Sequence, residues 1–104
     1  MTMLTADQID HYRNKGYISS VNALTSNEAK DIRNEIEKIE KNWPGALEGI
    51  NRNYVHLISP ILNKVCLNKN ILDAVESIIG KNILICGTTL FIKEKNEKGF
   101  VSFH

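Results

Sequence analysis

The sequence predicts an α+β fold, with helices first and extended segments last. Between residues 5 and 80, apolar side chains recur at intervals of three and four, which is typical of helices that pack on one side. Residues 83–93 and 100–103 are instead rich in β-branched and aromatic side chains, which favour strands. We therefore expect a helical front over residues 1–80 and the first strands of a sheet over residues 83–104.

The first two helices have complete start signals. Thr5 is followed three residues later by Gln8, and Thr25 is followed three residues later by Glu28, so each pair can form a capping box. Gly16 is expected to end the first helix. The apolar stripe of the second helix consists of Ala29, Ile32, Ile36, Ile39 and Trp43. Its remaining, mostly charged positions are typical of a helix face turned to solvent.

The later elements follow from similar signals. Residues 17–21 predict a short strand between the first two helices. Ser59 can cap a short helix that Pro60 opens, since proline is well suited to the first helical position. Asn70 is expected to cap a fourth helix, and Gly80 is expected to close it.

Composition narrows the class of protein. The chain has 104 residues, of which 42% are hydrophobic and 24% are charged, and these values are typical of a single globular domain. The net charge is +1 and no basic stripe is visible, so we expect neither nucleic acid nor a membrane surface as a partner. No apolar run is long enough to span a bilayer. Residues 1–7 lack the features of a signal peptide, so we expect a cytoplasmic location.

The last two apolar segments do not make a finished sheet. A two-stranded hairpin is marginally stable by itself, and its open edges can pair with other strands. The sequence therefore predicts either further strands or self-association through these open edges.

Several segments also follow one another in a specific order. Residues 4–9 (LTADQI) precede residues 16–18 (GYI), and residues 71–84 (ILDAVESIIGKNIL) precede residues 89–93 (TLFIK) and the final pair Phe103-His104. This arrangement resembles the N-terminal portion of the phytanoyl-CoA dioxygenase family. The resemblance implies a double-stranded β-helix, a jelly-roll or cupin-like fold with helices packed outside. Residues 1–104 would then be the N-terminal part of one such domain, with a truncated, incomplete barrel.

The resemblance also implies a cofactor chemistry. Members of that family bind Fe(II) and 2-oxoglutarate and couple decarboxylation of this co-substrate to oxidation of a small-molecule substrate. Their iron lies in a His-x-Asp…His triad, and His104 matches the first histidine. The resemblance further implies that Thr89 and Arg52 contact 2-oxoglutarate. The alternatives are a plain strand residue for Thr89 and an exposed loop cation for Arg52.

Other side chains that could act as ligands fit structural roles. We expect His11 to be a surface residue and His56 to be partly buried and hydrogen-bonded, with a pocket-lining role as the alternative. Cys66 and Cys86 lie among apolar residues without metal-site spacing, which favours buried, reduced thiols.

Three functional hypotheses follow. The first is the front part of an Fe(II)/2-oxoglutarate-dependent dioxygenase that hydroxylates a small organic or acyl substrate, inactive as this chain alone. The second is a related halogenase, in which a small residue would replace the carboxylate expected two positions after His104. The third is a non-catalytic helical interaction module, stabilised by a partner or by a second copy.

Overall fold

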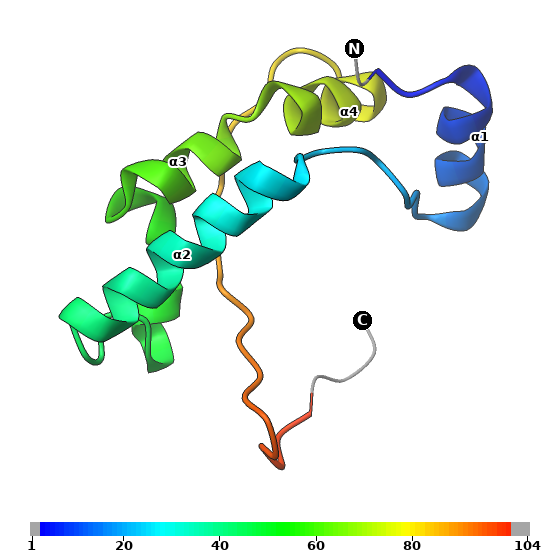
Figure 1. Cartoon of the computed structure of the whole chain (residues 1–104). Coiled ribbons are helices and arrows are strands. Elements are labelled where there is room, and N and C mark those ends of the chain that lie inside the picture. Colours follow the sequence, from blue (N-terminus) through cyan, green and yellow to red (C-terminus); the bar gives the residue numbers. More distant parts are fainter. Residues whose placement is uncertain (1–2, 101–104) are drawn as a thin grey trace.

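The computed structural model describes residues 3–100. Its helices follow one another along the chain, and an extended segment comes after them (Figure 1). The elements are α1 (Ala6–Lys15), α2 (Ser26–Asn42), the short 3₁₀ helices η1 (Gly49–Arg52) and η2 (Val55–Leu57), α3 (Pro60–Cys66) and α4 (Lys69–Ile79).

The helix starts confirm the capping predictions. In both α1 and α2 the threonine hydroxyl accepts a hydrogen bond from the backbone N–H three residues later. The Gln8 and Glu28 side chains accept hydrogen bonds in return from the N–H groups of Thr5 and Thr25. Each box therefore satisfies backbone groups that a helix leaves unpaired at its start.

The later helix ends agree with the sequence in all but one case. Ser59 caps α3 with Pro60 in its first turn, and Gly80 ends α4. The cap of α4 is Asn68 rather than Asn70, because the Asn68 side chain accepts from Ile71 N–H at 3.1 Å. Asn70 lies in the first turn and donates to the Ala23 carbonyl at 3.2 Å, which ties α4 to the segment before α2.

The predicted α+β class is wrong for the part of the chain that the structure describes. Residues 3–100 contain no strand, and their single β-bridge joins Asn53 to Thr89. Neither residues 17–21 nor residues 83–93 form a strand, so the expected first strands of a double-stranded β-helix are not formed. The physical reason is that a strand exists only when a neighbouring backbone supplies a ladder of hydrogen bonds. The second segment of the expected hairpin lies largely outside the described residues.

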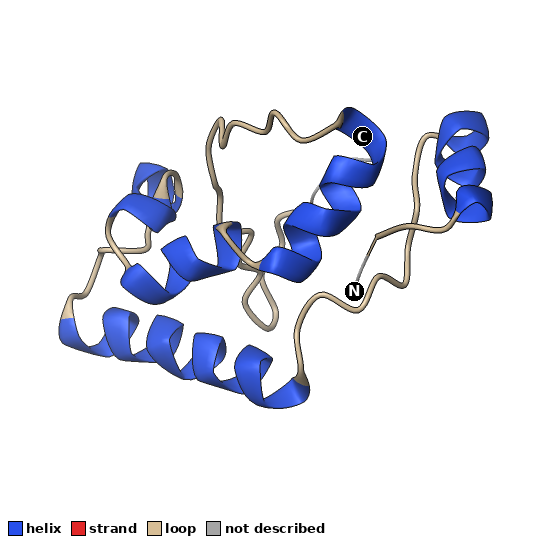
Figure 2. Cartoon of the chain, turned by 90° about the horizontal axis from the view of Figure 1, so that it is seen from above, coloured by secondary structure: helices blue, strands red, loops and turns tan. Residues whose placement is uncertain are grey.

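A small apolar core lies where α2, α3 and the 3₁₀ helices meet. Its buried members are Ile39, Leu47, Val55 and Leu62, with Ile32, Ile36, Ala46, Ile61 and Leu90 packed against them. α1 stands apart from this core in both views of the ribbon (Figures 1 and 2), and none of its residues is buried. Leu4, just before α1, is buried, and its N–H donates to Ser77 Oγ of α4 at 3.0 Å.

The chain is more open than a compact protein of its size. Its accessible surface is 8515 Å², whereas a compact monomer of 11.8 kDa exposes about 5900 Å². Its radius of gyration is 15.8 Å, against about 13 Å for a compact chain of this length. Many large apolar side chains after α2 are exposed: Trp43, Ile50, Tyr54, Leu57, Ile58, Leu67, Ile79, Leu84, Phe91 and Phe100.

Among the helices of residues 3–100, none combines the length and the apolar character needed to cross a bilayer.

The position of the core predicts that two leucine-to-alanine substitutions will change the free energy of unfolding by very different amounts. Leu47 is 2% exposed and Leu57 is 73% exposed. We expect Leu47→Ala to lower the free energy of unfolding by about 2–5 kcal/mol, because it leaves a cavity in a small core. Leu57→Ala should change it by less than about 0.5 kcal/mol. Urea unfolding followed by circular dichroism measures both values, and equal losses would contradict the core described above.

Candidate functional site

The candidate site lies where the extended segment passes the loop between η1 and η2. Tyr54 N–H donates to the Thr88 carbonyl at 2.7 Å, and Leu90 N–H donates to the Arg52 carbonyl at 2.9 Å. These two bonds flank the Asn53–Thr89 bridge. We call this pairing of residues 52–54 with residues 88–90 the junction.

A histidine and a threonine meet at the junction. His56 Nδ1 lies 2.7 Å from Thr88 Oγ1, and the His56 backbone N–H donates to the same hydroxyl oxygen at 3.4 Å. Both residues are half-buried. His56 is therefore partly buried and hydrogen-bonded, as its apolar neighbours in the sequence predict. The threonine hydroxyl holds the imidazole against the extended segment.

Beside this pair is an open hollow of about 430 Å³. Its lining residues are Asn53, Tyr54, Cys86, Gly87, Thr88 and Thr89. A Cβ atom at Gly87 would lie 3.2 Å from Tyr54 Cε1, so glycine leaves room for the aromatic ring. Tyr54 itself has a left-handed backbone, with φ of 57°, which turns the chain from η1 into η2.

Thr89 lies on the rim of this hollow. It is exposed, and its hydroxyl donates to Asn53 Oδ1 at 2.9 Å. Thr89 lines the hollow, and its hydroxyl oxygen can still accept a hydrogen bond from a small polar ligand there. The predicted contact of Thr89 with 2-oxoglutarate stays a prediction.

Arg52 has a different setting. Its Nε donates to the Leu47 carbonyl at 2.9 Å, and its Nη1 donates to the Ile92 carbonyl at 3.4 Å. The side chain is half-buried, so it is not the exposed cation of the alternative interpretation. Through these two bonds the guanidinium ties the extended segment to the loop that follows α2.

The surroundings of Arg52 are acidic. It lines a hollow of about 340 Å³ together with Glu40, Glu48 and Glu94. Three carboxylates near one guanidinium compete with an incoming dicarboxylate such as 2-oxoglutarate. This setting favours a structural role, and the predicted co-substrate contact is untested.

The structure brings two of the three predicted site residues to one place. The Arg52 carbonyl accepts from Leu90 N–H, and Thr89 bridges to Asn53, so Arg52 and Thr89 lie diagonally across the junction. Their side chains line different hollows. The third, His104, lies outside the described residues. Sequence reasoning did not find the His56–Thr88 contact. These residues are 32 positions apart, and no local motif links them.

The described residues do not fit an iron ion by themselves. Within residues 3–100, no group of three or more His, Cys, Asp or Glu side chains could hold a metal. Cys66 and Cys86 are free thiols. Cys66 is half-buried and Cys86 is exposed, so the prediction of a buried thiol is wrong for Cys86. Its exposure follows from its position on the outer side of the extended segment.

Comparisons of the chain with protein-family models, with curated proteins and with solved structures find no match. The family resemblance therefore stays a prediction from the sequence. What the geometry defines is a helical unit that carries an extended segment, with a polar hollow at their junction.

The two bonds of Arg52 predict how the segment is held. We expect Arg52→Gln to lower the free energy of unfolding by about 1–3 kcal/mol, because it removes hydrogen bonds from a charged donor. It should also speed hydrogen exchange at the Leu90 amide. Arg33→Gln is the matched control, since Arg33 pairs with Glu37 on an exposed helix face. Its effect should stay within about 0.5 kcal/mol. Unchanged exchange at Leu90 in the Arg52 variant would contradict the tie.

Substitution of two adjacent threonines is expected to lower the free energy of unfolding by different amounts. Thr88→Val removes the half-buried partner of His56 and should cost about 1–2 kcal/mol of unfolding free energy. Thr89→Val removes only an exposed hydrogen bond and should cost less than about 0.5 kcal/mol. Urea titration of both variants tests this order. Equal costs would mean that the His56–Thr88 contact does not stabilise the junction.

Proposed function

We propose that this chain supplies the helical front of an Fe(II)- and 2-oxoglutarate-dependent oxygenase that hydroxylates a small organic or acyl substrate. The ordered segments that resemble the phytanoyl-CoA dioxygenase family support this proposal. The structural observation that supports it is the junction, where Thr89, the candidate co-substrate contact, bridges to Asn53 and lines an open hollow of about 430 Å³.

The chain alone is proposed to be inactive. Iron bound with 2-oxoglutarate would supply the oxidising chemistry, but residues 3–100 contain no set of three ligands for it. A single imidazole does not hold Fe(II) against water. The role of the described residues is therefore positional: Arg52 and the backbone bonds hold the extended segment, and Thr89 presents a hydroxyl at the hollow.

A second candidate function belongs to another class. The excess of accessible surface over that of a compact monomer, about 2600 Å², favours a non-catalytic helical module that works by binding a partner. Large apolar side chains such as Ile50, Leu57 and Leu84 are also exposed, and a gathering of exposed apolar side chains is typical of a surface that another polypeptide covers.

Anaerobic titration of the chain with Fe(II) and 2-oxoglutarate tests the inactive state. We expect no stoichiometric metal-to-ligand charge-transfer band, because the described residues lack a ligand set. Titration with 2-oxoglutarate alone is the control for absorbance of the co-substrate. A saturable band at one iron per chain would contradict the proposal that the chain is inactive alone.

The coding DNA after codon 104 separates the functions directly. Codons for glutamine and then aspartate would complete the His-x-Asp motif from His104 and support the hydroxylase. A small residue in place of the aspartate would favour the halogenase. A stop codon at once, with no partner chain that carries the remaining ligands, would overturn both oxygenase hypotheses and leave the binding module.

A further inference from the structure

Residues 83–92 form an extended segment whose side chains alternate between two sides. Ile83 and Ile85 are half-buried, whereas Leu84 between them is 90% exposed. Further along, Phe91 is 78% exposed. A period of two is that of a β-strand, although the segment is paired only at the junction. Leu84 and Phe91 therefore make its outer side apolar.

The alternation shifts by one residue in the middle of the segment, where Cys86 and Gly87 are exposed in succession. Such a shift is typical of a bulge. Because of this shift, residues 83–86 read forwards and residues 92–89 read backwards show the same order of half-buried and exposed side chains. The outward side chains are those of Leu84, Cys86, Thr89 and Phe91, and the half-buried, inward ones are those of Ile83, Ile85, Thr88, Leu90 and Ile92.

The backbone of the segment also has two edges. The Thr88 carbonyl and the Leu90 N–H face residues 52–54. In an antiparallel pair successive residues direct their N–H and C=O groups to opposite edges, so those of Thr89 and Phe91 face away from the junction. Among residues 3–100, no backbone hydrogen bond reaches this outer edge, which can therefore accept a second strand.

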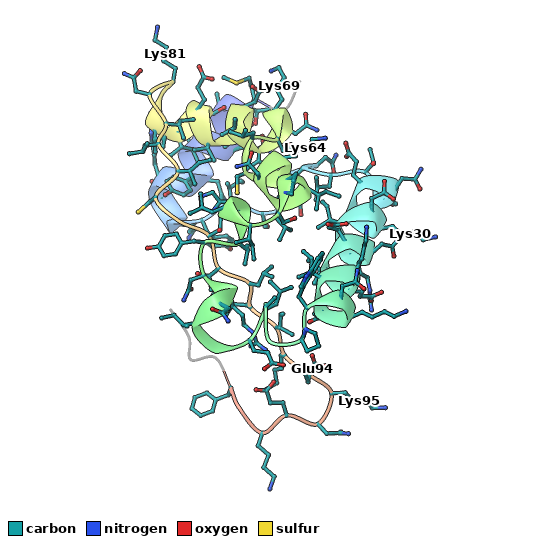
Figure 3. The ribbon with its side chains drawn as sticks, turned by 90° about the vertical axis from the view of Figure 1, so that its left-hand side faces the viewer. Lys30, Lys64, Lys69, Lys81, Glu94 and Lys95 are labelled. Carbon is teal, nitrogen blue, oxygen red and sulfur yellow. The ribbon has the colours of Figure 1, made fainter. Side chains whose placement is uncertain are left out.

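Charges flank the segment but do not interrupt it. Residues 82–92 carry no charged side chain. Lys81 precedes the segment at the top of Figure 3, and Glu94 follows it in the lower half of that view. Within residues 3–100 neither of them takes part in an ion pair.

We propose that two copies of this chain pair antiparallel through the outer edges of residues 83–92. In this register Leu84 of each copy lies opposite Phe91 of the other, and Lys81 lies opposite Glu94. The repeated burial pattern keeps every outward residue on one side of the paired strands. Because each contact occurs twice about a two-fold axis, the pair is closed rather than open-ended.

The exposed side chains of the segment agree with this occupant. Leu84 is 90% exposed and Phe91 is 78% exposed, and the pairing covers both of them in each copy. Pairing of the strands also supplies hydrogen bonds to the outer-edge backbone groups. The pairing goes beyond the proposed oxygenase role and concerns this chain by itself, since the further strands of an oxygenase barrel would compete for the same edge. Its test involves no iron, so failure of one proposal does not imply failure of the other.

Sedimentation equilibrium of the full chain gives the first test. We expect a concentration-dependent monomer–dimer equilibrium for the wild type. Leu84→Glu places a carboxylate against Phe91 of the second copy, and it should weaken the dimer about tenfold or more. Trp43→Glu is the matched control. Trp43 is also exposed, at 60%, but it lies outside the segment, so this variant should dimerise normally. Circular dichroism checks that both variants keep their helices.

Charge reversal tests the register itself. Lys81→Glu or Glu94→Lys alone sets like charges opposite each other twice per dimer, and either should weaken association by about three- to tenfold at low salt. The double variant Lys81→Glu/Glu94→Lys should restore association to near the wild-type value. Restoration is the result that a different register would not give.

Three outcomes would overturn the proposal. The first is a wild-type chain that stays monomeric up to its solubility limit, which would leave the outer edge to a strand from another protein. The second is open-ended assembly without a dimer. The third is equal weakening by Leu84→Glu and Trp43→Glu, which would place the contact between copies elsewhere.

Discussion

The tie between Arg52 and the extended segment is the interaction on which the rest of the structure depends. The helices bury few side chains, and the core formed by Ile39, Leu47, Val55 and Leu62 is small. The segment after α4 joins this core through Leu90, and it is held there by two backbone bonds and by the Arg52 guanidinium. Without this tie, the junction, the hollow beside Tyr54 and the outer edge of the segment would have no fixed position.

The same tie explains why one chain carries both a polar hollow and an apolar edge. At the junction, one edge of residues 88–90 is occupied by residues 52–54. The hydroxyls of Thr88 and Thr89 are directed to partners on that side, His56 and Asn53. Leu84 and Phe91, toward the two ends of the segment, remain exposed. Polar chemistry is thus concentrated at the paired middle, and apolar surface at the unpaired ends.

Local sequence signals predicted the starts of most helices, but they did not predict the contacts between residues that are distant in the sequence. Thr5 and Thr25 act as caps because a capping box needs only residues three positions apart. Asn70 was wrongly predicted as the cap of α4. The cap is Asn68, two positions earlier, and no local rule distinguishes one asparagine from the other. The strands predicted over residues 17–21 and 83–93 failed for a different reason. Strand-forming side chains make a strand only when another backbone pairs with them, and that depends on the remainder of the fold.

By itself, the sequence determined the starts of α1, α2 and α3 and the end of α4, because caps, glycines and proline act within one turn of the chain. It also determined the lack of charge in residues 83–92, which follows directly from the order of side chains. Only the tertiary structure decided that Arg52 binds the Leu47 and Ile92 carbonyls, that His56 meets Thr88, and that Cys86 is exposed. Each of these depends on how distant parts of the backbone approach each other, and that approach is set by packing around the small core rather than by neighbours in the sequence.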